Sequence, residues 1–317
     1  MLYATRMATE LRALGHDASI TESDDPTLPG DAVPIVDGLL LPTLLPRLHE
    51  LVQRDAIALV FHPTARAGRD PGARPAVQTA EQSMLPALRR VVATSAEVAT
   101  RLAQDFGVPS GALHVVQPGL DALPRSTGNN MASSTGTPGP CRILSVGVLT
   151  PRKGHDILLR AAARLADLAW TMDIAGASGR DPAHADALQD QIRTLDLDAR
   201  ATLHRDPAPA ALDALWRRAD LFALATRWEA YPTAVAEALR RGLPLLVSAG
   251  GAAAAMVPAA AGLACPLDDE PTLSKCLRRL VFDGALRADM ADASWQAGQD
   301  LPGWPAQAAL LDTVVRG

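Results

Sequence analysis

The sequence has few lysines and cysteines, no polybasic segment and no long apolar run. Of its 30 basic residues only Lys153 and Lys275 are lysines, and residues 1–140 carry 11 Arg against 14 Asp and Glu. The formal net charge is −5. Without a basic patch, nucleic acid binding is disfavoured and no surface for anionic lipids is indicated.

The cysteines and histidines show no spacing typical of a C-x-x-C motif or of a metal site. Cys141, Cys265 and Cys276 are odd in number and have neither metal-ligand nor C-x-x-C spacing. They are typical of reduced thiols, so we expect a cytoplasmic protein. The seven histidines form no H-E-x-x-H, and we predict no metal site.

No apolar stretch approaches a membrane span and no targeting signal begins the chain, so no transmembrane segment is expected, although peripheral membrane contact stays open.

What is present is a pattern of alternating strands and helices. With 48% hydrophobic and 21% charged residues, 317 residues suffice for two globular domains. The periodicity predicts an extended or strand segment at 33–41 and strands at 16–20, 56–61, 90–93, 114–117, 142–146, 171–175, 201–204, 221–225 and 245–247. It predicts helices at 5–14, 44–53, 80–88, 96–106, 286–297 and 304–315, and a loop over 64–77. Such alternation favours parallel α/β sheets.

A linker divides this pattern in two. Residues 126–140 read S-T-G-N-N-M-A-S-S-T-G-T-P-G-P, which is poor in apolar residues and rich in turn formers. We therefore predict a first domain over 1–125, a linker over 126–140 and a second domain over 141–300. Two facing lobes would leave a cleft between them, where ligands commonly bind.

Two carboxylates eight positions apart, Glu229 and Glu237, lie in the segment R-W-E-A-Y-P-T-A-V-A-E-A-L. A helix beginning near Pro232 or Thr233 would place Glu229 on the preceding loop and Glu237 within the helix. The open amides at that helix start attract phosphate, and the carboxylates suit flanking hydroxyls, as in a nucleotide sugar. The alternative is that Glu237 merely decorates an amphipathic helix.

Two adjacent cations follow a predicted strand in I-L-S-V-G-V-L-T-P-R-K-G-H-D-I-L. Arg152 and Lys153 would then lie at the carboxyl end of a parallel strand, where open α/β sheets bind ligands. A lysine is a suitable point-charge partner for a diphosphate, and an arginine can add a forked contact. The alternative is a solvated pair on a loop.

These segments resemble the retaining GT-B glycosyltransferases, in particular the family 4 group. The matching pieces are S-V-G-V-L-T-P-R-K-G-H-D, D-I-A-G, A-D-L-F-A-L-A, the E-x7-E element and G-L-P-L-L-V-S-A-G-G, in register over residues 142–282. A looser likeness in R-A-L-G-H-D, V-D-G, F-H-P, V-V-A-T-S and V-V-Q-P-G-L-D extends it to most of the chain.

The resemblance implies an α/β, GT-B fold with two Rossmann-like domains facing across a cleft, and a helix over 301–317 that returns to the first domain. The donor would be a nucleotide-diphosphate sugar held by the second domain, and the first would hold an unknown sugar, lipid or small-molecule acceptor. No other cofactor is implied. Transfer would retain the anomeric configuration, with attack on the face that the leaving group departs from and a donor phosphate oxygen taking the acceptor proton.

Site residues carry over by position. Lys153 would bind the diphosphate with Arg152 as a second cation, Glu237 the ribose hydroxyls and Glu229 the transferred sugar. His62 matches a histidine that meets the donor sugar, although a buried structural histidine is the alternative. The catalytic residues would thus be His62, Lys153 and Glu229. The rest of the donor pocket would comprise Gly147, Gly176, Tyr231, Pro232, Thr233, Gly250 and Gly251.

The chain departs from the family pattern at several positions. Val148 stands where an arginine is common, Ala230 and Pro232 replace usual glycines, and Arg66 and Ala67 stand where a glutamate is expected. The family also opens with a strand and a Gly-Gly loop that this sequence does not show, so either the start is assigned late or the first domain lacks that strand. The alternatives are therefore a GT-B-like nucleotide- or glycan-binding protein without turnover, and an epimerase or phosphorylase.

Overall fold

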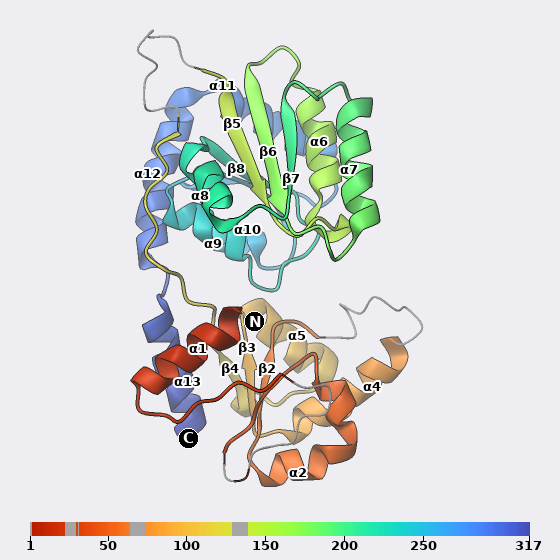
Figure 1. The fold of residues 1–317 in the computed structure, drawn as a ribbon, viewed down its shortest axis with the longest axis vertical. Coiled ribbons are helices and arrows are strands. Elements are labelled where there is room, and N and C mark those ends of the chain that lie inside the picture. Colours follow the sequence, from red (N-terminus) through yellow and green to blue (C-terminus); the bar gives the residue numbers. More distant parts are fainter. Residues whose placement is uncertain (1, 23–29, 31, 64–73, 129–138) are drawn as a thin grey trace. The chain divides into compact units, whose positions relative to one another are not determined.

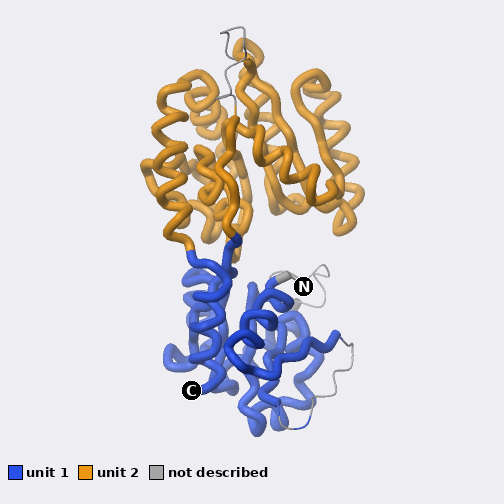
Figure 2. The backbone as a smooth tube through the Cα atoms, turned by 60° about the vertical axis from the view of Figure 1, so that its left-hand side comes forward, with its two compact units in different colours: residues 1–121, 302–317 blue, residues 122–301 orange. Residues whose placement is uncertain are grey.

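The computed structural model describes the whole chain except residues 1, 23–29, 31, 64–73 and 129–138. The chain divides into two compact units (Figure 2): Met1–Asp121 with Pro302–Gly317, and Ala122–Leu301. Each unit contains one sheet of parallel strands with helices packed against it. The predicted α/β class is confirmed.

The described part of the first unit contains a four-stranded parallel sheet in the order β1-β2-β3-β4. Its strands are β1 (Ile35–Asp37), β2 (Ile57–Val60), β3 (Arg90–Ala93) and β4 (Leu113–Val115). Its helices are α1 (Leu2–Ala13), α2 (Leu48–Gln53), α4 (Arg74–Met84), α5 (Ala96–Phe106) and α13 (Trp304–Arg316), with short 3₁₀ helices η1 (Leu41–Arg47), η2 (Leu85–Ala87) and η3 (Ser110–Ala112).

The last helix of the chain packs beside the first, as Figure 1 shows for α1 and α13. Apolar residues at helical spacing give each helix one buried face. Tyr3 and Trp304 meet edge to face with their ring centroids 5.8 Å apart. Both helices share a core with strands β2 and β3, through Met7, Leu11, Ile57, Leu59, Val92, Ala308, Leu311 and Val314.

Two local predictions for this unit are wrong. Residues 16–20 form no strand: Arg12 Nε donates to Ala18 O at 2.7 Å, and His16 pairs with Asp312 of α13. Residues 16–20 are therefore fixed by side chains of α1 and α13, and among the described residues they pair with no strand. The predicted loop over 64–77 is wrong for residues 74–77, because they belong to α4, which begins at Arg74. Residues 64–73 lie outside the described residues.

The predicted helix 96–106 is confirmed, and the Ser95 hydroxyl caps it by accepting from Val98 N at 3.2 Å. A side-chain oxygen at this position satisfies an amide that the helix itself cannot.

The second unit contains a six-stranded sheet in the order β10-β9-β8-β5-β6-β7, with every described pairing parallel. Its strands are β5 (Cys141–Val146), β6 (Trp170–Gly176), β7 (Ala201–Arg205), β8 (Leu221–Leu224), β9 (Leu245–Ser248) and β10 (Gly262–Cys265). From β5 the chain proceeds outward through β6 to β7, then returns to β8 and proceeds the other way. The order thus reverses between β5 and β8, and open α/β sheets bind ligands outside the carboxyl ends of strands at such a point.

Helices cover both faces of this sheet (Figure 1). One apolar cluster joins it to α6 (His155–Ala163), α7 (Pro182–Thr194) and α11 (Glu270–Phe282). A second cluster joins it to α8 (Pro209–Arg218), α9 (Thr233–Arg240), α10 (Ala253–Met256) and α12 (Gly284–Asp300). Among the helices that the structure describes, none is long and apolar enough to cross a membrane.

Candidate functional site

Two loops meet at the carboxyl ends of β5 and β8. After β5 the chain forms the short helix η5 (Pro151–Lys153), and Arg227 N, beyond β8, donates to Arg152 O at 2.8 Å. The contact depends on Gly154, which has φ +67° and lies so close to Ala225 O that a Cβ would stand 1.9 Å from it. This glycine therefore lets the cationic loop approach the loop of the E-x7-E motif.

We expect Gly154→Ala to destabilise the second unit by about 2–4 kcal/mol, because the Cβ would be strained at this φ and would clash with backbone. Urea unfolding measures the change. Gly179 is the matched control, since it lies in a loop of the same unit where an added Cβ would meet nothing within 4 Å, and Gly179→Ala should change stability by less than about 0.5 kcal/mol. Equal effects of the two substitutions would contradict this role of Gly154.

Glu229 holds the two cations through one oxygen. Its Oε1 accepts from Lys153 Nζ at 2.6 Å and from Thr226 Oγ1 at 2.9 Å, and it lies 3.3 Å from the Arg152 guanidinium. The Glu229 and Lys153 side chains are only 6% and 12% exposed. Burial lowers the pKa of Lys153, and the Glu229 carboxylate opposes that change. Within the described residues Glu229 Oε2 makes no hydrogen bond, so it can accept one from a ligand.

Arg227, which the sequence analysis did not single out, holds the cationic loop in place. Its guanidinium donates to both Asp156 oxygens at 3.1 Å, to Asp268 at 2.9 Å and to the carbonyl of Pro151. The sequence offered two signals for this contact: Arg227 lies two residues before Glu229, and Asp156 lies in R-K-G-H-D. Because its charge is compensated by two carboxylates, Arg227 is a positioning residue.

Gly250 and Gly251 fix the backbone of Glu229 from the β9 side. Glu229 N donates to Gly250 O at 3.1 Å, and Ala252 N donates to Glu229 O at 2.9 Å. A Cβ on Gly251 would lie 2.3 Å from Glu229 O, and one on Gly250 would lie 2.2 Å from Thr226 O. Only glycines allow the two backbone segments to approach this closely. The packing therefore requires Gly250 and Gly251 in addition to any contact that they make with a ligand.

Gly147 and Gly176 have comparable packing. A Cβ on Gly147 would lie 3.0 Å from Lys153 Cδ, and one on Gly176 would lie 1.8 Å from Gly147 O. Gly176 therefore lets the loop after β5 rest on the end of β6, and Gly147 makes room for the lysine side chain.

Helix α9 presents open amides beside these loops. Its N-cap is Pro232, no described side chain caps it, and its first helical hydrogen bond runs from Ala236 N to Pro232 O. The amides of Ala234 and Val235 thus precede the hydrogen-bonded ladder and can bind an anion. Thr233 is exposed, whereas Tyr231 is buried and burial raises its pKa to about 12.

Glu237 stands in the second turn of α9 and is half-buried. Burial raises its pKa, and the charge of Arg241 opposes that change only in part. Within the part of the chain that the structure describes, its carboxylate makes no hydrogen bond or ion pair, so it does not contact Lys153, Arg152 or Glu229. An unpaired carboxylate of this kind is available to a ligand that offers hydroxyl groups.

His62 differs from the other predicted site residues because it belongs to the first unit. It follows β2, is half-buried, and places Nδ1 3.3 Å from Pro63 O. Its role toward the donor sugar stays a prediction.

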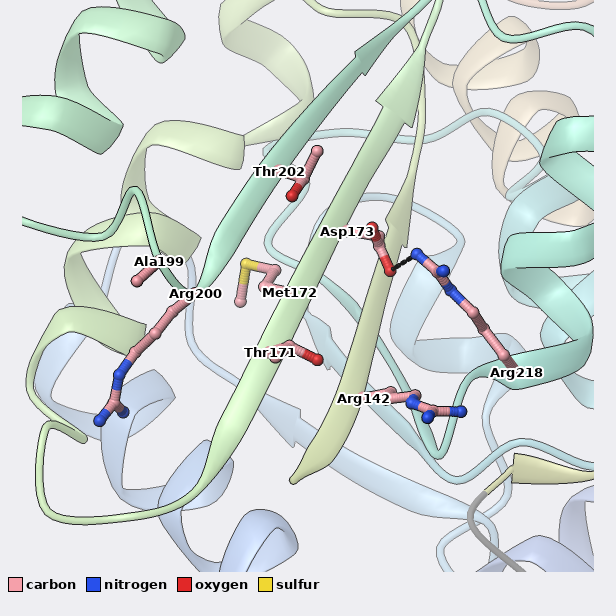
Figure 3. Close-up of a pocket in the computed structure, with 8 residues that line it drawn as sticks. All are labelled: Arg142, Thr171, Met172, Asp173, Ala199, Arg200, Thr202 and Arg218. Atoms are coloured by element: carbon pink, nitrogen blue, oxygen red, sulfur yellow. Dashed lines mark hydrogen bonds and ion pairs between the residues drawn. The ribbon is translucent and has the colours of Figure 1, made fainter. Parts of the chain in front are cut away.

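A separate pocket of about 310 Å³ opens at the amino ends of β5, β6 and β7, the opposite edge of the sheet (Figure 3). Asp173 there pairs with Arg218 and His204, each at 2.7 Å, while Arg200 points away from Asp173 and Arg218. Of its charged lining residues Asp173 and Arg218 are paired with each other, and the pocket lies at the end of the sheet opposite Lys153 and Glu229, so it is not the candidate donor site.

Comparison with protein families identifies the chain. The family model described as glycosyl transferases group 1 matches residues 129–296, just over half of the sequence. The chain belongs to the glycosyl transferases group 1 family. It is 29% identical over 256 residues to a D-inositol 3-phosphate glycosyltransferase of Kineococcus radiotolerans, covering 74% of this chain and 59% of that protein. A protein of the same name from Rhodococcus opacus is 29% identical over 231 residues, covering 70% and 51%. The chain thus spans between half and three fifths of these relatives' length.

Solved structures of glycosyltransferases share the fold of this group 1 chain. Sucrose-phosphate synthase from Thermosynechococcus elongatus superposes with a TM-score of 0.75 at 20% identity, covering 89% of this chain and 72% of that one. HepE of Anabaena in complex with UDP-glucose gives a TM-score of 0.74 at 17% identity, covering 89% and 79%. The expected GT-B class with two Rossmann-like domains is thereby confirmed.

Proposed function

We propose that this group 1 chain is a retaining glycosyltransferase that moves a sugar from a nucleotide-diphosphate sugar to an acceptor. The observation that carries the proposal is the buried contact of 2.6 Å between Lys153 and Glu229, beside Arg152 and next to the uncapped start of α9. Cations, open amides and a carboxylate with one free oxygen suit a diphosphate that is joined to a hydroxyl-bearing sugar.

Each group has a definite task in the proposed reaction. Lys153, Arg152 and the amides of Ala234 and Val235 bind the diphosphate and stabilise the negative charge that develops on it as the glycosidic bond breaks. Glu237 accepts hydrogen bonds from the ribose hydroxyls, and Glu229 Oε2 accepts one from the transferred sugar. A donor phosphate oxygen takes the acceptor proton, so the acceptor attacks on the face that the leaving group departs from, and configuration is retained.

The division of labour between the two units belongs to the proposal as well. The second unit binds the donor, and the first unit supplies the acceptor side together with His62. We place the reaction in the cytoplasm, since three unpaired cysteines fit a reducing compartment. The names of the relatives suggest UDP-glucose as the first donor to test and an inositol phosphate as the first acceptor.

Thermal unfolding against a panel of UDP-, GDP- and ADP-sugars tests the donor step. A ligand that binds only the folded chain at 100 times its Kd adds about 2.7 kcal/mol of stability, so one nucleotide should raise Tm clearly above the others. Nuclear magnetic resonance of the product then reports its anomeric configuration. Absence of stabilisation by every sugar nucleotide, an inverted product, or an epimerised donor without transfer would overturn the proposal.

A further inference from the structure

Contacts with neighbouring side chains fix the orientation of the Glu229 carboxylate. Its three side-chain partners among the described residues, Lys153, Thr226 and Arg152, meet the same oxygen, Oε1. Thr226 is fully buried and the Glu229 side chain is 6% exposed. The carboxylate therefore cannot turn away from a bound ligand without breaking a buried ion pair, which is costly. Its second oxygen stays in a fixed position, free to meet whatever the donor site holds.

The net charge of the candidate donor site is small once the ion pairs of its neighbouring residues are included. Arg227 is compensated by Asp156 and Asp268, so the charges that we assign to the site are the cations Arg152 and Lys153, the carboxylate of Glu229 that touches them, and Glu237 on α9. A nucleotide sugar carries about two negative charges. A free nucleoside diphosphate carries nearly three at neutral pH, because its terminal phosphate loses a second proton near pH 6. After transfer the spent nucleotide thus brings more negative charge and no sugar hydroxyls.

We propose that Glu229 makes the site prefer an intact nucleotide-diphosphate sugar over the nucleoside diphosphate left after transfer. This inference rests on the proposed function. With the donor bound, Oε2 accepts a hydrogen bond from a sugar hydroxyl. With the spent nucleotide bound, the same oxygen meets the terminal phosphate, and two like charges face each other at a weakly solvated position. The carboxylate thereby favours donor binding and promotes release of the product.

A purely structural role for Glu229 predicts a different pattern. If the carboxylate served only to hold Lys153 in place, its removal would weaken both nucleotides alike, since both use the lysine through the diphosphate. Glu229→Gln separates the two roles because the amide keeps the size of the side chain and an acceptor oxygen for Lys153 while it removes the negative charge.

Titration calorimetry with UDP and UDP-glucose, or with the matched pair that stabilises the wild-type chain best, is the test. For Glu229→Gln we expect the nucleoside diphosphate to bind about tenfold more tightly and the sugar nucleotide about three- to tenfold more weakly. Glu237→Gln is the matched control: its ribose partner is common to both ligands, so both should weaken by the same factor and their ratio should stay constant.

The pH dependence gives a second readout. Between pH 5 and 7, about one unit either side of the phosphate pKa, the wild-type preference for the donor should rise with pH, and in Glu229→Gln it should not rise. Equal weakening of both ligands in Glu229→Gln, or an unchanged ratio, overturns this inference alone. Failure of every nucleotide to bind the wild-type chain overturns the proposed function itself.

Discussion

Lys153→Ala is expected to lower kcat/KM for the nucleotide sugar by about 10²–10³-fold, the loss typical of one preorganised group that stabilises developing charge. The lysine is nearly buried and contacts Glu229 at 2.6 Å, so the substitution removes a charge from the diphosphate site and also leaves the carboxylate without its closest cation. Steady-state kinetics over a range of donor concentrations measures the effect.

Lys275 provides the control because it is the only other lysine in the chain and lies exposed on α11. Lys275→Ala should leave kcat/KM within about twofold, as expected for an exposed residue away from the site. If Lys153→Ala retained full activity while folded, the lysine would have no part in catalysis. If both variants lost activity equally, the general loss of positive charge would be the cause.

Glu237→Gln is expected to raise the stability of the chain and to weaken nucleotide binding by about 10–100-fold. Burial raises the pKa of Glu237, so the folded state disfavours its ionised form. For a carboxyl group with a raised folded pKa, stability increases as pH falls through that pKa, and the neutral amide has this advantage at every pH. Binding changes in the opposite direction because the ribose hydroxyls lose a charged acceptor.

Thermal unfolding and titration calorimetry at several pH values test both halves of this prediction. In the wild-type chain nucleotide affinity should fall as Glu237 takes up its proton at low pH, and in Glu237→Gln that contribution should vanish. A variant that is less stable and binds nucleotide normally would show that Glu237 supports the fold and not the ligand.

The cationic loop and the first carboxylate were accessible from sequence because both follow parallel strands. A strand ending at Val146 and another ending near Ala225 had to deliver Lys153 and Glu229 to the same edge of one sheet, provided that the strands are neighbours. Their direct contact was not predictable. It depends on Gly154 and on the three donors gathered on one oxygen, which arise from packing between segments far apart in the chain.

Other features had weak local signals. Strand β10 was not predicted because G-L-A-C contains no β-branched or aromatic residue, and only its pairing with β9 makes it a strand. Residues 16–20 show the opposite case. The alternation of polar and apolar residues predicted a strand, but contacts with Arg12 and Asp312 fix this segment in a conformation that is not a strand. The clamp formed by Arg227 joins Asp156 and Asp268, whose proximity only the folded chain creates.

The most direct test of the central claim is a crystal structure of the chain with the nucleotide sugar selected by thermal unfolding. We predict the diphosphate within hydrogen-bond distance of Lys153 Nζ and of the Ala234 and Val235 amides, with ribose hydroxyls on Glu237 and a sugar hydroxyl on Glu229 Oε2. Density for the nucleotide at the amino ends of β5 to β7, or a diphosphate that does not touch Lys153, would contradict the claim.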